Sequence, residues 1–393
     1  MSNRLNPKPI FCAIATLSVT CAANAANWEI LPRLQGGYRY DDNYRLNQPG
    51  AEVEVSGAEA DATLLFRNVD PRTKIEIAPR VRATYFPDES DEDSTDYFLR
   101  AGYQDATPRR TMGIDANFAH EDVVRTEFST DPQGPLGNPD VATDTTTFLR
   151  NKRDLYEVRP SFSYDFSQRN SMALEAQYVD AKFENHYNGA QSDFSQADFN
   201  AGWTFQASER YSYTLRAIAA HYETVDSANA YGAQAEWGAQ ISQRSRMYVR
   251  VGGQNTKPEN RGSEVSWLGG IGGEWMSERN HLFLDLTHSV NAVSAGTVVE
   301  RTQLRFLLNH DISERISMLL GLSGHHDTSI DGTAAYPDRD YATGQAGLEW
   351  RVQRALAITA TYTYRWQDDD RFPSDVSANG FLVGVVYQPK RDY

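Results

Sequence analysis

Charged side chains recur at alternate positions in several segments of the chain. Arg80 and Arg82 lie two residues apart, and Arg301 and Arg305 lie four apart. Successive side chains of a β-strand point to opposite faces, so each pair would share one face of a strand. Such rows offer electrostatic chemistry: a charged surface around a pore selects ions and polar solutes through its local potential.

Evidence for catalysis or metal binding is weaker. His325-His326-Asp327 is the densest candidate, but adjacent strand residues face opposite ways, so the two histidines do not readily share a metal. Asp331, Asp338 and Asp340 lack the glycine and the terminal Glu of a calcium-binding loop. No Gly-x-Ser-x-Gly or phosphate-binding loop is present. We expect no enzyme, cofactor or metal site. With eight histidines in the chain, folding could still bring a Ser and a His together, so that alternative stays open.

A short polar turn repeats along the chain. The repeats are Ser167-Gln168-Arg169, Ser208-Glu209-Arg210, Ser242-Gln243-Arg244, Ser277-Glu278-Arg279, Ser313-Glu314-Arg315 and, more loosely, Val352-Gln353-Arg354. The arginines are 41, 34, 35, 36 and 39 residues apart. Each interval holds two segments of alternating hydrophobicity with a polar loop between them, which indicates a repeated β-hairpin.

The hairpins add up to about eighteen strands. One strand shows the pattern: Leu356, Ile358, Ala360 and Tyr362 alternate with small or polar residues. The strands are predicted near 30–43, 60–68, 74–86, 97–105, 111–124, 155–166, 171–184, 196–206, 211–224, 230–241, 246–256, 264–275, 281–292, 298–309, 316–326, 341–351, 355–366 and 379–388. Eight short turns and nine longer loops predict an all-β fold: a transmembrane antiparallel up-and-down β-barrel, with sixteen strands as the nearest alternative.

The predicted barrel is too wide to be a soluble protein. Eighteen strands enclose more space than side chains can fill, so the apolar face must point to lipid and the polar face to water. Mean hydropathy is −0.59 and no apolar run of about twenty residues occurs, which excludes helical spans. Outward aromatic residues fall near both strand ends, as expected for two interfacial girdles; they are Trp237, Trp275 and Trp350 at one end and Tyr38, Tyr40, Tyr85, Tyr364 and Trp366 at the other.

The N-terminus has the pattern of a secretory signal. Arg4 and Lys8 precede an apolar stretch, and Ala23-Asn24-Ala25 offers a cleavage site. We therefore predict a signal peptide at 1–25 and one barrel domain at 26–393. Both cysteines of the chain, Cys12 and Cys21, lie in the predicted signal, and a lipoprotein cleaved at Cys21 is the less favoured alternative. Removing Arg4 and Lys8 changes the formal charge from −15 to −17, which argues against nucleic acid as a partner.

Two loops stand out. The segment 87–96 carries six carboxylates, which suit either a plain solvated loop or divalent-cation bridges to lipopolysaccharide phosphates. The segment 126–152 is the longest interruption and contains Pro132, Gly134, Pro135, Gly137 and Pro139. It folds into the barrel as a constriction or stays outside; the sequence does not decide between the two.

The chain resembles a known family at this point. Four features carry the resemblance: the signal, the run Leu34-Gln35-Gly36-Gly37-Tyr38-Arg39-Tyr40-Asp41-Asp42-Asn43, about nine hairpins, and the ending Gly384-Val385-Val386-Tyr387. With these features the chain resembles the outer-membrane β-barrel porins (β-barrel porin 2-like) encoded with exopolysaccharide biosynthesis and export systems. Barrel-assembly signals usually end in an aromatic residue; here Tyr387 or Tyr393 fits, with Pro389 between them.

The resemblance implies an outer-membrane conduit for a secreted polysaccharide. Its implied partners are outer-membrane lipid, lipopolysaccharide, the polysaccharide itself and a periplasmic polysaccharide export protein. A general diffusion porin for small hydrophilic solutes, and a mainly structural barrel, stay open as alternatives because function follows from the site and not from the fold.

Alternation also assigns charges to the lumen. The last five predicted strands and the first four form one wall, because barrel closure makes them neighbours. Its inward arginines are Arg33, Arg39, Arg67, Arg80, Arg82, Arg100, Arg301, Arg305, Arg351 and Arg365, against the acids Glu29, Asp41, Asp61, Glu76 and Glu349. The opposite wall carries Asp115, Glu157, Asp165, Glu175, Asp198, Glu236, Glu274 and Asp285 against Arg159, Arg216 and Arg250. The sequence thus predicts a basic wall facing an acidic wall, with mutual cross-strand ion pairing as the alternative.

Overall fold

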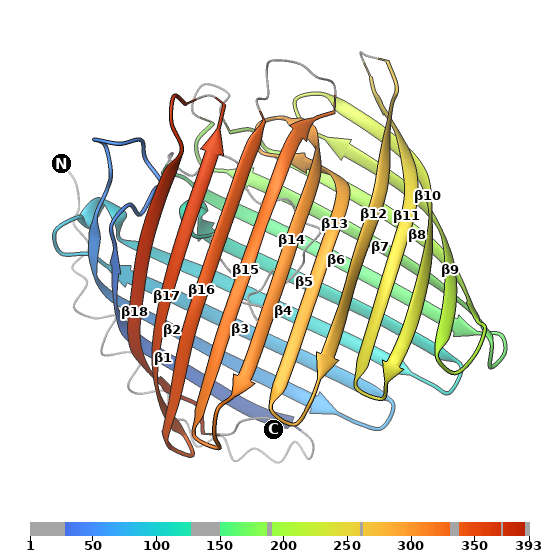
Figure 1. Cartoon of the computed structure of the whole chain (residues 1–393), viewed down its shortest axis with the longest axis horizontal. Helices are drawn as coiled ribbons and strands as arrows, with labels where there is room; N and C mark the ends of the chain where they lie inside the picture. The colour runs from blue at the N-terminus through green and yellow to red at the C-terminus, as the bar shows by residue number, and fades with distance from the viewer. Residues whose placement is uncertain are drawn as a thin grey trace.

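The computed structural model describes residues 28–126, 150–186, 191–259, 262–330, 338–370 and 372–389. The predicted signal at 1–25, most of the segment 126–152, and Tyr393 lie outside these residues. Within them the chain forms eighteen antiparallel strands (Figure 1): β1 Trp28–Asp41, β2 Val55–Val69, β3 Thr73–Tyr85, β4 Ser94–Ala106, β5 Arg110–Asp122, β6 Lys152–Asp165, β7 Asn170–Phe183, β8 Phe194–Gln206, β9 Tyr211–Glu223, β10 Ser227–Ser242, β11 Ser245–Pro258, β12 Glu264–Met276, β13 Asn280–Val293, β14 Thr297–Asp311, β15 Ile316–Ser329, β16 Arg339–Gln353, β17 Leu356–Asp369 and β18 Val376–Tyr387.

The strands close into a single barrel. Every strand pairs with its neighbours in the sequence, and β18 pairs with β1 through Tyr387 opposite Leu34 and Gly380 opposite Asp41. The predicted all-β antiparallel barrel is confirmed, with eighteen strands and not sixteen. Tyr387 is the last strand residue and pairs with both Leu34 and Leu356, so it completes the final strand.

Only two short helical segments occur among the described residues, η1 Ser90–Glu92 and α2 Val123–Thr126. In that part of the chain no helix has the length and apolar character needed to cross a membrane.

The Ser-x-Arg motifs form the tight turns, and all of them lie at one rim. In the turn before β15, the Ser313 hydroxyl oxygen accepts hydrogen bonds from the N–H groups of Arg315 and Ile316. Ser167 and Ser208 bond in the same way to the residues two and three positions later. A serine that satisfies two turn N–H groups closes a tight reversal, which explains why the motif recurs at alternate strand connections.

Two strand prolines, Pro79 and Pro160, lie where the ladder is interrupted on one side. The β2–β3 register runs from Thr63 opposite Arg80 directly to Phe66 opposite Ile77, so Pro79 has no pairing on that side. A comparable gap in the β6–β7 register spans Pro160. Proline has no N–H to donate. Because the ladder is already interrupted at these positions, the missing N–H removes no ladder hydrogen bond there.

The outward face is apolar and exposed. Val383 is 56% exposed, Trp350 51% and Tyr38 59%, although all three lie within paired strands. An aqueous protein would bury such residues, whereas a barrel in a bilayer turns them to lipid. This is the architecture of outer-membrane barrels.

The connections opposite the turns are more varied than predicted. Two of the nine expected longer loops are only three residues, 224–226 between β9 and β10 and 294–296 between β13 and β14. Several strands also extend past their predicted ends on this loop side. The strand β2 begins at Val55, β4 begins at Ser94 and β15 continues to Ser329.

Candidate functional site

The interior of the barrel is the candidate site, and the strand register places every predicted wall residue on the inner face. Arg80, for example, lies opposite Thr63 and Phe98, on the face away from exposed Val81. The same parity applies on the other wall, where Asp115 lies opposite Gly102 and Arg159 while exposed Ile114 points outward. What the structure adds to the prediction is how these charges are partnered.

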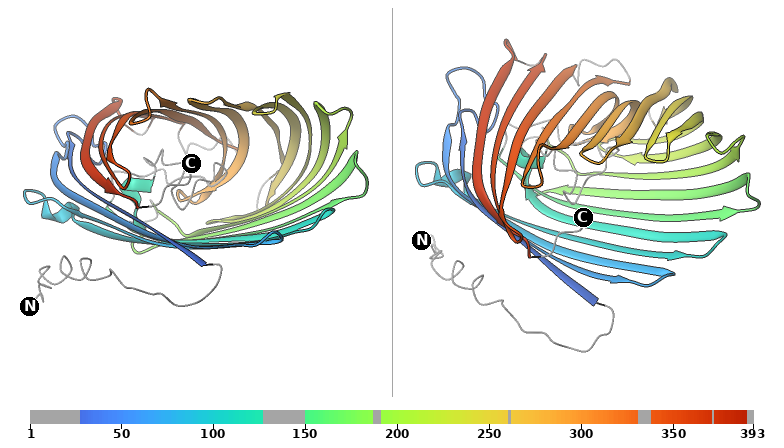
Figure 2. Two further views of the ribbon diagram at one scale, coloured as in Figure 1. Left: turned by 90° about the horizontal axis from the view of Figure 1, so that it is seen from below. Right: turned by 60° about the horizontal axis from the view of Figure 1, so that its bottom comes forward.

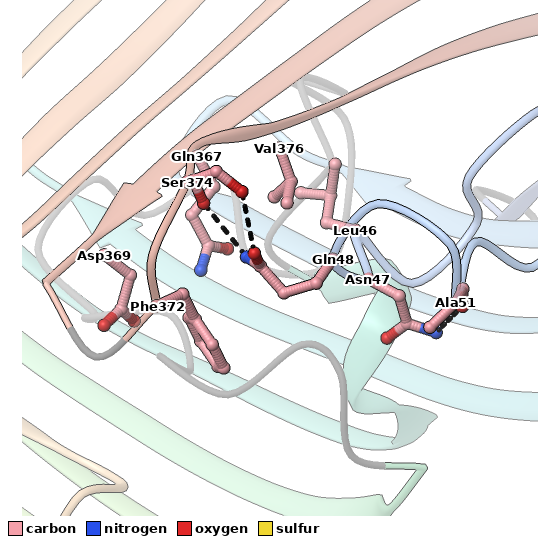
Figure 3. Close-up of a pocket in the computed structure, with 9 residues that line it drawn as sticks. All are labelled: Leu46, Asn47, Gln48, Ala51, Gln367, Asp369, Phe372, Ser374 and Val376. Carbon is pink, nitrogen blue, oxygen red and sulfur yellow. Dashed lines mark hydrogen bonds between the residues drawn. The ribbon is translucent and has the colours of Figure 1, made fainter.

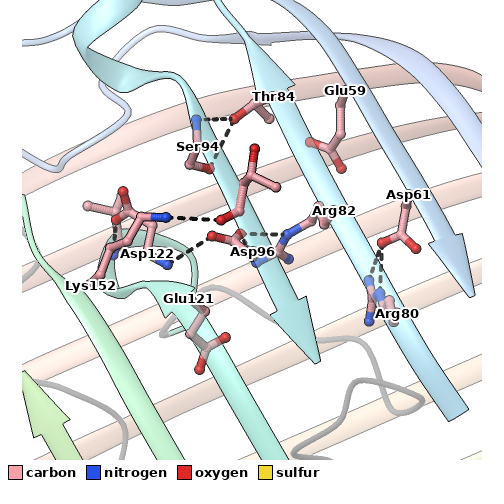
Figure 4. A network of polar contacts seen from close by, with 12 residues as sticks. Glu59, Asp61, Arg80, Arg82, Thr84, Ser94, Asp96, Glu121, Asp122 and Lys152 are labelled. Atoms are coloured by element: carbon pink, nitrogen blue, oxygen red, sulfur yellow. Dashed lines mark hydrogen bonds and ion pairs between the residues drawn. The ribbon is translucent and has the colours of Figure 1, made fainter. Parts of the chain in front are cut away.

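Most arginines of the predicted basic wall have a carboxylate partner on the next strand. Arg39 binds Glu59 at 2.6 Å, Arg80 binds Asp61 at 2.6 Å, and Arg82 binds Asp96 at 2.9 Å. Figure 4 shows the last two of these pairs side by side on β2, β3 and β4. This wall is therefore an ion-pair ladder over much of its area, as the pairing alternative predicted.

Two further pairs on this wall lie toward the loop side and are almost fully buried. Arg301 binds Asp327 through two contacts of 2.6 Å, and Arg365 binds Asp41 at 2.6 Å. All four side chains are at most 4% exposed. Bidentate arginine–carboxylate pairs of this kind hold their geometry tightly.

Sequence reasoning missed several of these carboxylates for one reason. Glu59, Asp96 and Asp327 lie just beyond the predicted strand ends, but the strands continue and so does the inward parity. Extending each predicted strand by one residue would have included them. The net positive charge of the predicted basic wall is correspondingly smaller.

The predicted acidic wall is also partly neutralised. The Glu157 carboxylate accepts hydrogen bonds from Arg159 at 2.5 Å, Asn117 at 2.9 Å and Gln177 at 3.0 Å. Glu274 is bound by Arg246 at 3.0 Å and His281 at 2.8 Å. Arg216 lies 4.0 Å from Glu236, at the limit of an ion pair.

Asp285 joins the two predicted walls. Its carboxylate forms an ion pair with Arg305 on β14 at 2.7 Å and lies 3.8 Å from Arg250 on β11. It also accepts a hydrogen bond from the Tyr248 hydroxyl. A carboxylate assigned to the acidic wall thus neutralises an arginine assigned to the basic wall, because β13 and β14 are adjacent.

A few inward charges stay open to the lumen. Arg100, Asp115 and Glu175 are exposed although they lie on the inner face, and among the described residues none of them forms an ion pair. Within the described residues, the Arg33 side chain donates a hydrogen bond to Gln35 on the same strand, at 3.2 Å, and forms no ion pair. These side chains lie nearer the turns than the buried pairs do, so the turn side of the lumen is the water-exposed part of the interior.

On the loop side, the first connection folds inward. Arg365 donates to the carbonyl oxygens of Tyr44 and Asn43, at 3.1 and 3.2 Å, besides binding Asp41. Leu46, with φ of 53°, then packs against Tyr341, Val376 and Ala378. A cavity of about 230 Å³ remains between this connection and the β17–β18 connection, bridged by the Gln48–Ser374 hydrogen bonds (Figure 3).

The acidic segment 87–96 is partly internal. Glu92 forms a buried bidentate pair with Arg45 at 2.7 and 2.8 Å, and Asp96 binds Arg82. Asp93 accepts from the Phe86 N–H at 2.6 Å, and burial raises the pKa of its carboxyl above the ordinary value, against the opposing effects of that bond and Arg150. Half of the six carboxylates therefore have structural partners, which weakens the case for a cation bridge to lipopolysaccharide.

The β13–β14 hairpin leaves the wall and enters the lumen (Figure 2). Ser294 O accepts from Ser192 N at 2.7 Å, and Ala292 N donates to the Gln196 side chain at 3.2 Å. The Tyr222 hydroxyl donates to Val290 O at 3.3 Å. Since β8 is five strands away from β13 in the barrel, the hairpin tip spans a chord of the lumen.

An apolar cluster fills the space beneath this tip. Val290 and Ala292 pack with inward residues of β6, β7, β9, β10 and β12, among them Leu155, Tyr222 and Leu268. The sequence left open whether the segment 126–152 folds inward as a constriction, and most of that segment lies outside the described residues. Among the described residues, the lumen is narrowed by the β13–β14 hairpin.

The histidine pair behaves as predicted from strand parity. His325 points inward, is buried and stacks on Tyr341 with ring centroids 5.3 Å apart. His326 lies on the other face, half exposed, and bonds Asp340 at 2.8 Å. In the described ranges, no group of three or more His, Cys, Asp or Glu side chains is arranged to hold a metal ion.

Comparisons with known proteins give a likeness of fold only. No family model and no curated protein matches the chain. Among solved structures, Acinetobacter baumannii OccAB2 is similar at 9% identity and a TM-score of 0.47, over 92% of this chain and 98% of that one. Pseudomonas aeruginosa OccK2 (OpdF) is similar at 9% identity and 0.48, with the same coverage of both chains. The Pseudomonas aeruginosa siderophore receptor PirA is similar at 8% and 0.42, over 91% of this chain and 80% of that one.

Proposed function

We propose that this protein is a porin-like channel of the bacterial outer membrane that passes small hydrophilic solutes. The observation that carries the proposal is the closed eighteen-stranded barrel with an apolar exterior and a charged, partly water-exposed interior. A barrel with a purely structural role does not need water-exposed charges on its inner face, such as those of Arg100 and Glu175. A catalytic role is not part of the proposal.

The interior favours small solutes over a polymer. On the loop side Arg153, Arg339 and Asp327 point inward but are at most 1% exposed, and the β13–β14 hairpin crosses the lumen. A polysaccharide chain needs a continuous water-filled route past these side chains. The exopolysaccharide conduit implied by family resemblance, with its periplasmic export partner, is therefore the less favoured function.

The remaining parts of the proposal follow from the sequence. We propose that 1–25 directs export and is removed, so that the barrel begins near residue 26. The exterior then contacts outer-membrane lipid and lipopolysaccharide, and no nucleic acid is involved.

Liposome swelling tests the solute class. Proteoliposomes of the folded barrel should swell in small sugars at a rate that falls as the sugar grows, and should exclude a bacterial exopolysaccharide. A deletion strain should keep normal polymer secretion. Loss of exopolysaccharide secretion from the deletion strain, with no sugar permeation, would instead support the conduit.

Ion selectivity should depend on the open charges more than on the paired ones. We expect Arg100→Glu to shift the reversal potential toward cations, because Arg100 is exposed to the lumen without a carboxylate partner in the described chain. The matched control is Arg80→Gln with Asp61→Asn, which removes a paired charge of each sign and should shift it little. Single-channel recording in a salt gradient measures both. Equal shifts would mean that paired residues set selectivity.

A further inference from the structure

The seam between β12 and β13 is incompletely paired. Their ladder ends at Gly269 opposite His288, yet β12 continues to Glu264 and β13 continues to Val293. The β12–β13 ladder therefore does not extend to 264–268 and 289–293, which pair instead with β11 and β14 on their other sides. Continuing the same register would pair Leu268 with Ser289 and Glu264 with Val293, so the two segments match residue for residue.

The sequence of 289–293 suits a place in the wall beside β12. Val290 and Ala292 continue the outward parity of Leu284 and Leu286, while Ser289 and Asn291 continue the inward parity of Asp285. In the wall, the two apolar residues would face lipid beside Trp267 and Val265 of β12. Here they are instead buried in the cluster inside the lumen.

A buried polar atom points to the same pairing. The hydroxyl oxygen of Ser266 is inaccessible and, in the part of the chain that the structure describes, has no hydrogen-bond partner. Continuing the register places Asn291 directly opposite Ser266 on the inner face. An amide can both donate to and accept from a hydroxyl, so wall pairing would satisfy an atom that now lacks a partner.

The inward position is held by polar contacts across the lumen. Among them are hydrogen bonds to Gln196 of β8, to Tyr222 of β9 and to Ser192, which lies just before β8. At the tip Gly296 has φ of 79°, and a Cβ there would lie 2.5 Å from Val225 Cγ2. The inward position thus gives the hairpin backbone hydrogen-bond partners across the lumen, whereas a position in the wall would give 289–293 partners in the β12 ladder.

We propose that the β13–β14 hairpin is a gate with two positions. In the position seen here it crosses the lumen and narrows it. In the second, 289–293 pairs with 264–268, the wall is completed and the lumen widens. The inference rests on the proposed channel function, and it adds the segment that opens and closes the channel. Two packings of one segment, each self-consistent, are what a population shift requires.

Engineered disulfides can trap each position. Val265→Cys with Ala292→Cys would be directly opposite in the completed ladder, where paired Cα atoms lie about 4.5–5.5 Å apart and a disulfide fits. Ser192→Cys with Ser294→Cys joins residues in contact across the lumen, where N and O are 2.7 Å apart. The control is Ser323→Cys with Thr343→Cys, register partners in the continuous β15–β16 ladder. The native cysteines, Cys12 and Cys21, fall in the predicted signal.

The expected result has two parts. All three pairs should cross-link under a mild oxidant, read as a mobility change on non-reducing gels. Oxidation should raise the single-channel conductance of the 265/292 pair, lower that of the 192/294 pair, leave the control unchanged, and be reversed by reductant. The gate is overturned if the control cross-links but 265/292 does not, or if both traps conduct alike. If no variant conducts at all, the channel function fails, while the cross-links still report whether the hairpin moves.

Discussion

Val383→Arg should nearly abolish assembly of the barrel. Val383 lies in the middle of β18, between Tyr38 and Ala360 of the adjacent strands, and it is exposed on the outer face. A cation near the bilayer midplane of a barrel costs roughly 2–4 kcal/mol. Since folded proteins are stable by only about 5–15 kcal/mol, this is a large fraction of the total. We expect the folded, heat-modifiable band to fall sharply, and Ile358→Arg on β17, which lies nearer the turn and opposite Trp350, to lower it less.

Thr361→Arg is the matched control. Thr361 is on β17, opposite Leu382 and Gly347, and lies on the inner face. An arginine there extends into the lumen, so its charge stays in water and assembly should continue. If all three variants assembled to the same level, the assignment of inner and outer faces would be wrong.

Arg365→Met should be the most damaging change inside the barrel. It removes the partner of Asp41 and the hydrogen bonds to the carbonyl oxygens of Asn43 and Tyr44, at a site only 3–4% exposed. Removing one member of a buried ion pair typically costs about 3–5 kcal/mol, because the other charge is left without compensation. Urea unfolding of the barrel in detergent or liposomes would measure the loss.

Two further variants separate charge from packing. Arg365→Met with Asp41→Leu removes both charges and should recover much of the lost stability. Arg72→Met removes an exposed partner of Asp105 at a turn and should change stability little. A double variant as unstable as the single one would show that the loop contacts, and not the unpaired carboxylate, dominate.

The alternation of apolar and polar residues was sufficient to predict the strands and the faces. It works because lipid outside and water inside impose opposite demands on successive side chains, so Leu356, Ile358 and Tyr362 could be oriented from sequence alone. The Ser-x-Arg turns located the strand connections because Ser313 and its equivalents bond the turn backbone locally. Such local chemistry leaves a trace in the sequence.

The features that sequence did not reveal depend on contacts between distant segments. Arg45 and Glu92 lie in different connections, where no strand parity applies, and only the fold brings them together. The inward bend of β13 is also silent in the sequence, because Val290 and Ala292 are equally suited to lipid and to an apolar cluster. The two-wall charge pattern was predicted too strongly, because Glu59, Asp96 and Asp327 lie past the predicted strand ends. Its role in selectivity stays a prediction.

Planar-bilayer recording of the purified, folded chain tests the central claim most directly. The account predicts discrete, voltage-driven current steps whose size rises with salt and falls when small sugars are added to the solution. Heat-denatured protein should give none. A correctly folded eighteen-stranded barrel that gives no current steps, in the wild type and in the reduced and oxidised 265/292 variant, would contradict the claim that this protein is a channel.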